Sequence, residues 1–119
     1  MHYPAAGIVA EYNPFHNGHL YHIEQARRES SAEAVVVVLS SDFVQRGEPA
    51  MLDKYTRTEA ALACGADLVL ELPVLFSAHN AGVFANAAVD ILAASGIVTH
   101  IAFGAEDPNC LTDTLIDIL

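Results

Sequence analysis

Tryptophan is absent from this sequence, and its 119 residues include only two cysteines and five lysines or arginines. Cys64 and Cys110 lie far apart and form no CxxC pair, so the sequence has neither a zinc signature nor a disulfide framework. The longest unbroken apolar run, residues 34–39, is far shorter than the ~18 residues of a membrane span. The first residues lack the basic and apolar regions of a signal peptide. We therefore expect a cytoplasmic protein without a membrane partner.

The basic residues are also unevenly distributed, because all five fall in the first half of the chain: Arg27, Arg28, Arg46, Lys54 and Arg57. From residue 58 onward there are eight acidic residues and no lysine or arginine, and the formal net charge is -10. A chain of this charge repels nucleic acid non-specifically. If the function involves RNA, we do not expect this segment to be the main docking surface.

The sequence is rich in apolar residues, at 53%, and they alternate between strand-like and helix-like segments. Short apolar runs predict strands at residues 6–10, 34–39, 67–72 and 98–103. Helical spacing predicts helices at residues 17–30, 55–64, 77–95 and 109–119, the second ending at Gly65. This order predicts an α/β fold of Rossmann type, an open parallel sheet with helices on both faces. The chain has the length of one domain, but its uncapped apolar end suggests that the domain is incomplete.

Ligands of such sheets bind beyond the carboxyl ends of the strands. At the first of these ends stands His16-Asn17-Gly18-His19, which opens a predicted helix. A helix N-terminus attracts anions, and Asn17 is a favoured capping residue there. Gly18 would let a ligand approach the backbone, and both histidines could donate N–H groups to phosphate oxygens. The motif thus predicts a phosphate-binding site.

Three other interpretations of the histidines remain open. A metal site could use His16, His19, His22 and Glu11, although helical geometry turns His22 away from His16. A general base would need an orienting carboxylate, and the spacing supplies none. The histidines could also serve only to cap and pack the helix. We predict no resident metal site.

Three of the five basic residues, Arg46, Lys54 and Arg57, lie within twelve positions that follow the second predicted strand. We consider them possible contacts to phosphate or RNA, with a solvated loop arginine as the alternative for Arg46. Lys54 and Arg57 stand at the start of a predicted helix, where a positive charge is poorly placed against the helix dipole. Arg27 and Arg28 stand near the end of a helix, where a cation is favourable, and we assign them a structural role.

The HNGH string in its strand–turn–helix setting resembles the HxGH signature of the nucleotidyltransferase superfamily, whose fold is the HUP type of the Rossmann-like class. The longer strings EYNPFHNGHLYH, SSDFVQRGEPAMLDKYTRTEAAL, GADLVLELP and IAFGAED resemble the start of the bacterial tRNA(Met) cytidine acetate ligase family. Members of that family are several times longer than this chain. The resemblance implies that residues 1–119 are an N-terminal nucleotide-binding domain, incomplete relative to the family.

The resemblance implies a two-step, ATP-dependent ligase. Acetate attacks the α-phosphate of ATP to give acetyl-adenylate, and the acetyl group then passes to N4 of the wobble cytidine of elongator tRNA(Met). Mg²⁺ would accompany ATP, and tRNA would bind mainly through segments absent from this chain. His16 and His19 would be catalytic. The residues implied to bind ATP are Val9, Ala10, Glu11, Tyr12, Asn13, Pro14, Phe15, His16, Asn17, Gly18, His19, Leu20, Tyr21, His22 and Gly104, the last of which would let adenine or ribose lie on the backbone.

Two alternatives accompany this expectation. The chain could be another HxGH adenylyl- or cytidylyltransferase, although the EYNPFHNGH and QRGEPA strings argue against it. It could also be a nucleotide-binding module without turnover.

Overall fold

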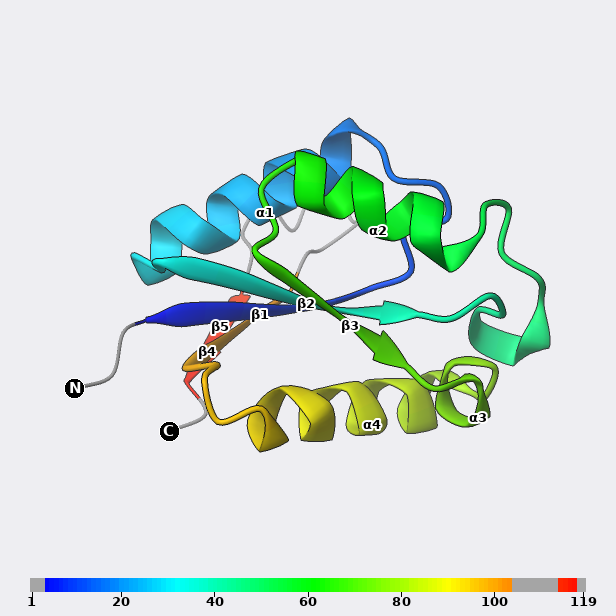
Figure 1. The fold of residues 1–119 in the computed structure, drawn as a ribbon. Helices are drawn as coiled ribbons and strands as arrows, with labels where there is room; N and C mark the ends of the chain where they lie inside the picture. The colour runs from blue at the N-terminus through cyan, green and yellow to red at the C-terminus, as the bar shows by residue number, and fades with distance from the viewer. Residues whose placement is uncertain (1–3, 104–113, 118–119) are drawn as a thin grey trace.

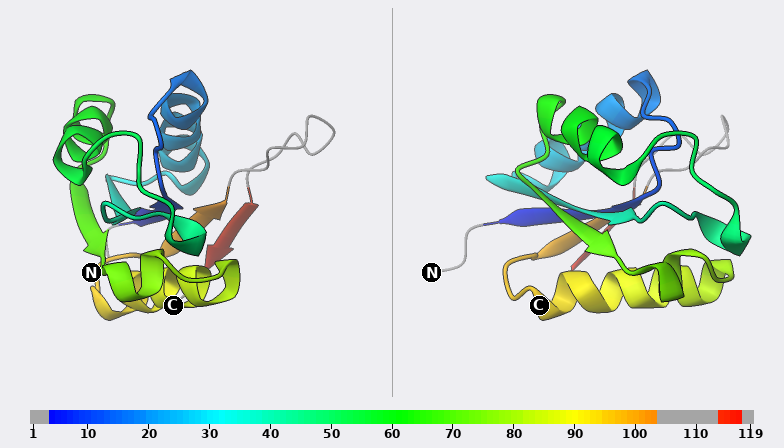
Figure 2. Two further views of the ribbon diagram at one scale, coloured as in Figure 1. Left: turned by 90° about the vertical axis from the view of Figure 1, so that its right-hand side faces the viewer. Right: turned by 45° about the vertical axis from the view of Figure 1, so that its right-hand side comes forward.

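The computed structural model describes residues 4–103 and 114–117, which form one sheet between two layers of helices (Figure 1). The strands are β1 (Ala5–Ala10), β2 (Ala34–Ser40), β3 (Leu68–Leu72), β4 (His100–Phe103) and β5 (Thr114–Asp117). The helices are α1 (Asn17–Ser30), the 3₁₀ turn η1 (Gln45–Gly47), α2 (Lys54–Ala63), α3 (Val74–Ser77) and α4 (Ala81–Ala94). Helices α1 and α2 cover one face of the sheet, and α3 and α4 cover the other (Figure 2).

The strand order is β3-β2-β1-β4-β5, and the first four strands in this order are parallel. The predicted Rossmann-like parallel sheet with helices on both faces is therefore confirmed. The chain moves outward from β1 to β3 and then returns to place β4 against the other side of β1. The strand order reverses between β1 and β4, and α/β sheets bind ligands at such a point.

Two predicted helices differ from the structure. Residues 114–117 form a strand, antiparallel to β4, where a helix over 109–119 was predicted. A sheet edge offers these residues backbone partners, and this pairing outweighs their helical spacing. The predicted helix 77–95 begins later, at Ala81, and follows the separate short helix α3, because Asn80 caps α4 by accepting a hydrogen bond from Val83 N at 2.9 Å.

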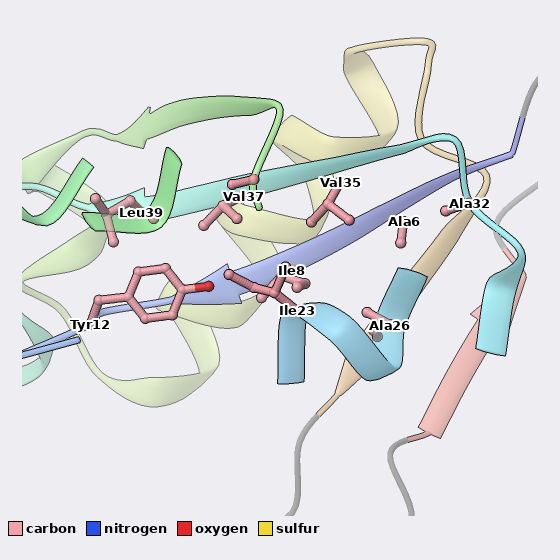
Figure 3. Packing of buried hydrophobic residues seen from close by; sticks show 12 residues of the cluster. Ala6, Ile8, Tyr12, Ile23, Ala26, Ala32, Val35, Val37 and Leu39 are labelled. Carbon is pink, nitrogen blue, oxygen red and sulfur yellow. The ribbon is translucent and has the colours of Figure 1, made fainter. Parts of the chain in front are cut away.

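Each face of the sheet has its own hydrophobic cluster. On β2, Val35 and Val37 pack toward α1 and α2, whereas Val36 and Val38 pack toward α4. This alternation follows from the period of two in a strand, and it confirms that β2 is buried on both faces. Figure 3 shows the cluster on the α1 and α2 side, which consists of small aliphatic residues and one aromatic ring, that of Tyr12.

Arg27 has the structural role expected of it. Its Nη2 lies 2.7 Å from Asp67 Oδ2 and 2.7 Å from Gly65 O, so it joins the end of α1 to the turn that precedes β3. Arg28 lies in the same last turn, where a cation interacts favourably with the helix dipole. Within residues 4–103 and 114–117, no helix is long and apolar enough to cross a membrane.

Candidate functional site

The HNGH motif lies where β1 ends and α1 begins, at the edge of the sheet where the strand order reverses. Figure 1 shows the chain leaving the carboxyl end of β1 and turning back above the sheet into α1. The α1 helix covers residues 17–30, as the sequence predicted. The predicted position of the motif is therefore confirmed.

His16, and not Asn17, caps α1. Its extended backbone (φ -144°, ψ 179°) lets its Nδ1 accept a hydrogen bond from Gly18 N at 3.0 Å. In return, His19 Nδ1 accepts a hydrogen bond from His16 N at 3.1 Å. The two imidazole rings stack with centroids 3.8 Å apart. This arrangement is a capping box built from two histidines.

The capping box fixes which nitrogen carries the proton in each ring. An Nδ1 that accepts a hydrogen bond has no proton, so in the neutral imidazole the proton is on Nε2. Both neutral rings therefore have their N–H donor at Nε2. Capping was one of the alternatives that the sequence left open, and the structure shows capping through Nδ1 of both rings.

Gly18 leaves room for the side chain of His16. A Cβ at this position would lie 2.8 Å from Cε1 and 3.0 Å from Nδ1 of His16. The sequence suggested that Gly18 makes space for a ligand, but the structure assigns that space to the capping ring. Any larger residue would displace the His16 ring from its cap.

An aromatic cluster packs against His19. Tyr12 is buried, with its ring centroid 4.7 Å from that of Phe15 and 4.8 Å from that of His19. Its φ of 48° lies in the left-handed region, which an aromatic residue adopts only when its surroundings impose it. Burial, aided by Cys64, raises the pKa of the Tyr12 phenol, so the ring stays uncharged. In Figure 3 its hydroxyl points inward among aliphatic side chains.

The long loop after β2 braces the loop after β1. Gln45 N donates to Glu11 Oε2 at 3.0 Å, and Met51 N donates to Asn13 Oδ1 at 2.6 Å. These backbone-to-side-chain bonds use the carboxylate of Glu11 and the amide oxygen of Asn13. No local pattern in the sequence indicates this pairing, because it joins residues more than thirty positions apart.

Arg57 is only 1% exposed, and this burial contradicts its predicted contact with phosphate or RNA. Its Nη1 donates to Glu11 O at 2.8 Å and to both oxygens of Ser40 at 3.1 Å. Its Nε donates to Leu52 O at 2.9 Å, and its Nη2 donates to Ser41 O. Burial lowers the pKa of the guanidinium, and nearby carboxylates oppose this effect. The sequence showed a positive charge at the start of a helix, where the helix dipole disfavours it. The interior hydrogen bonds of Arg57 explain why the charge is there.

Lys54 and Arg46 have different surroundings. Lys54 Nζ lies 2.6 Å from Glu71 Oε2, and this hydrogen bond raises the pKa of Lys54. The pair borders an open pocket of about 220 Å³ at the carboxyl ends of β2 and β3. Arg46 is exposed in η1, where its φ is 68° and its backbone N donates to His79 O at 3.0 Å. Of Arg46, Lys54 and Arg57, Arg46 alone has an exposed side chain that is neither buried nor paired with Glu71.

Two further expectations concern Gly104 and metals. Gly104 lies outside the described residues; it follows β4 in the sequence, and β4 pairs with β1. Within the described part of the chain, no group of three or more His, Cys, Asp or Glu side chains is arranged to hold a metal ion.

A family model described as HIGH Nucleotidyl Transferase matches residues 3–118 of the chain. The chain belongs to this family. Among curated HIGH nucleotidyl transferase relatives, the tRNA(Met) cytidine acetate ligase of Syntrophomonas wolfei is 57% identical, over 84% of this chain and 24% of the relative. The enzyme of the same name from Lysinibacillus sphaericus is 55% identical, over 95% of this chain and 29% of the relative.

Two solved structures of Thermotoga maritima TmcAL share the fold, each with a TM-score of 0.83. One is described as bound with alpha-thio ATP; it is 52% identical to this chain, and the match covers 87% of this chain and 25% of that one. The other is the apo form, 51% identical over 89% of this chain and 26% of that one. The resemblance to tRNA(Met) cytidine acetate ligases is confirmed, and this HIGH nucleotidyl transferase chain spans about a quarter of the length of those relatives.

Proposed function

We propose that this chain is the nucleotide-binding part of an ATP-dependent tRNA(Met) cytidine acetate ligase. ATP binds where β1 meets α1, along residues 9–22. The observation that carries this proposal is the reciprocal capping by His16 and His19, which gives both rings an Nε2–H donor at a helix N-terminus. It is supported by the T. maritima relative, which has half of its aligned residues in common with this chain and was solved with an ATP analogue.

The chemistry needs charge stabilisation more than it needs a base. The acetate oxygen attacks the α-phosphorus of ATP, the bond to the bridging oxygen breaks, and pyrophosphate leaves. The Nε2–H groups of His16 and His19 hydrogen-bond the departing phosphates and stabilise the charge that develops there. The N4 amine of the cytidine then attacks the acetyl carbon, and AMP leaves.

The remaining predicted contacts take more peripheral places. Gly104, one residue beyond β4, would lie beside adenine or ribose. Arg46, whose side chain is exposed, is the better placed of the remaining cations to meet phosphate or RNA. We assign no residue of this chain to Mg²⁺, which would be held by ATP phosphates and water. The acidic chain would leave most tRNA binding to other parts of the protein.

Calorimetric titration of ATP into the chain tests the proposal. His16→Asn keeps a good capping side chain but loses the Nε2–H, so the affinity should fall about tenfold while α1 stays capped. His16→Ala loses both and should fall at least as far. Glu29→Ala, in the exposed last turn of α1, serves as the control and should bind like the wild type. Equal affinities for all four proteins would overturn the phosphate-binding role of His16.

Pyrophosphate exchange distinguishes the acetate ligase from the alternatives. In the full-length protein that contains this chain, we expect exchange of pyrophosphate into ATP only when acetate is present. Exchange that requires another acceptor would favour a different HxGH nucleotidyltransferase. Binding of ATP without any exchange would favour a module without turnover. A gel shift at physiological salt should show little tRNA affinity for the 119-residue chain alone.

A further inference from the structure

Arg57 is a buried cation whose partners are almost all main-chain oxygens. Burying a guanidinium is costly unless its donors are satisfied, and here they bond to Leu52, Glu11, Ser40 and Ser41. No carboxylate accepts a hydrogen bond from it in the described part of the chain. A charge with such partners holds backbone segments in place.

Those partners come from three segments that meet at one edge of the sheet. Glu11 follows β1 directly, Ser40 is the last residue of β2, and Leu52 precedes α2. The planar fork of arginine can bond all three at once, because its donors point in fixed directions. The carboxyl ends of β1 and β2 are thus joined at the edge where the histidines lie.

A short series of contacts leads from Arg57 to the histidines. Glu11 O accepts from Arg57 Nη1 at 2.8 Å, and the next residue, Tyr12, has the left-handed φ of 48°. The Tyr12 ring packs against His19, whose Nδ1 in turn accepts from His16 N. A shift of the Glu11 carbonyl would therefore move Tyr12 and, with it, the ring that completes the capping box.

We infer that Arg57 is a positioning residue of the nucleotide site, which holds the β1–α1 loop in the conformation that presents Nε2–H of His16 and His19. It does so without touching the nucleotide. What the site binds rests on the proposed function, whereas the link from Arg57 to the histidines rests on the contacts alone. The effect on the histidines can therefore be measured without any nucleotide.

The first measurement is ¹⁵N NMR of the histidine side chains in the nucleotide-free chain. In the wild type, we expect His16 and His19 to show the Nε2–H form. Arg57→Lys keeps the charge, but one ammonium cannot reach all of these carbonyls, so the two histidines should become mixtures of tautomers. His100, at the opposite end of the sheet, should keep its signals. Ser40→Ala removes only one acceptor of Arg57 and should shift the same two signals by less.

The second measurement is ATP affinity at a temperature where each variant is fully folded. Arg57→Lys should bind ATP at least tenfold more weakly, and Ser40→Ala about twofold. Leu92→Ala, a destabilised variant of the opposite face, should bind like the wild type. If Arg57→Lys lowers the melting temperature but leaves the histidine signals and the affinity unchanged, Arg57 is merely structural.

The two experiments also separate this inference from the proposed function. If the histidine signals respond to Arg57→Lys but the wild type does not bind ATP, the proposed function fails and the positioning role stands. If Arg57→Lys does not fold, Ser40→Ala decides: unchanged signals for His16 and His19 would overturn the inference.

Discussion

Helices α1 and α4 are a matched pair on opposite faces of the sheet. Each has fourteen residues, a polar cap, and a glycine as its second residue. At α4 the cap is Asn80, and the helix buries Phe84, Ala88 and Leu92 against the sheet. At α1 the cap is His16, which shares a reciprocal pair of hydrogen bonds with His19.

The difference between the two helices shows how one fold can separate stability from function. An asparagine caps α4 with one simple bond and presents no titratable group. Two histidines cap α1 through Nδ1, which leaves the proton of each neutral ring on Nε2. Below them lie Tyr12 and the interior network of Arg57. The α4 face mainly supplies apolar burial, and the α1 face supplies the candidate site.

The largest effect should come from the α4 core. Leu92 is fully buried, and a Cβ on Gly7 would lie 3.0 Å from both of its Cδ atoms. Leu92→Ala leaves a cavity that β1 and α4 cannot close, which should cost about 3 kcal/mol of the free energy of unfolding. Urea denaturation measures this loss. If ATP affinity of the folded variant also fell, the two faces would not be separable.

Two glycine substitutions at equivalent helix positions sharpen the comparison. Gly18→Ala places a Cβ 2.8 Å from the His16 ring, whereas in Gly82→Ala the Cβ meets only Asn80 Oδ1 at 3.4 Å. Both variants gain helix propensity, worth up to about 1 kcal/mol, but Gly18→Ala also displaces the His16 ring that caps α1. We expect Gly18→Ala to weaken ATP binding about fivefold with little change in stability. Gly82→Ala should leave ATP binding unchanged. If calorimetry showed the same loss of ATP affinity in both variants, the comparison would be contradicted.

The cap of α4 should matter for stability alone. Asn80→Ala removes the acceptor for Val83 N and should cost about 1 kcal/mol in thermal or chemical unfolding. Asn80→Asp retains a capping oxygen and should restore most of that loss. A change in ATP affinity in either variant would show that the α4 face reaches the site.

The smallest effect should come from the ion pair between Arg27 and Asp67. Burial alone would raise the pKa of Asp67, but hydrogen bonds from Arg27 and Val35 N lower it below 3.8. A carboxyl with a lowered folded pKa stabilises the protein above its unfolded pKa, and that stability is lost as pH falls through the folded value. Asp67→Asn should therefore cost about 0.5 kcal/mol at pH 7, because much of the pair is exposed, and this cost should shrink as pH falls through the folded pKa. Unfolding curves over this range would refute the assignment if the difference stayed constant with pH.

Local patterns predicted much of the fold. The β-branched run of β2 is typical of a strand and the periodic spacing of α1 is typical of a helix, and both predictions were confirmed. The segment 114–117 was predicted wrongly, because its strand depends on the edge of β4 as a partner. The break before α4 was missed, because Asn80 caps a helix inside what looks like one apolar period.

The position of the candidate site was equally predictable, since a histidine-rich turn after the first strand has to lie at the carboxyl edge of the sheet. The roles of its residues were less so. General residue preferences assigned the helix cap to Asn17 and ligand space to Gly18. In the structure, His16 caps the helix, and its ring fills the space beside Gly18. Arg57 was misassigned because its partners Glu11 and Ser40 are distant in sequence.

The sequence by itself determined the four parallel strands β1 to β4, the alternation of strands with helices and the edge at which HNGH lies, because these follow from local spacing and from the rules of connection. Only the tertiary structure decided which nitrogen of each histidine is engaged, and that a buried arginine joins the ends of β1 and β2. Hydrogen-bond partners across the sheet depend on distances in space, and a one-dimensional pattern carries no record of those distances.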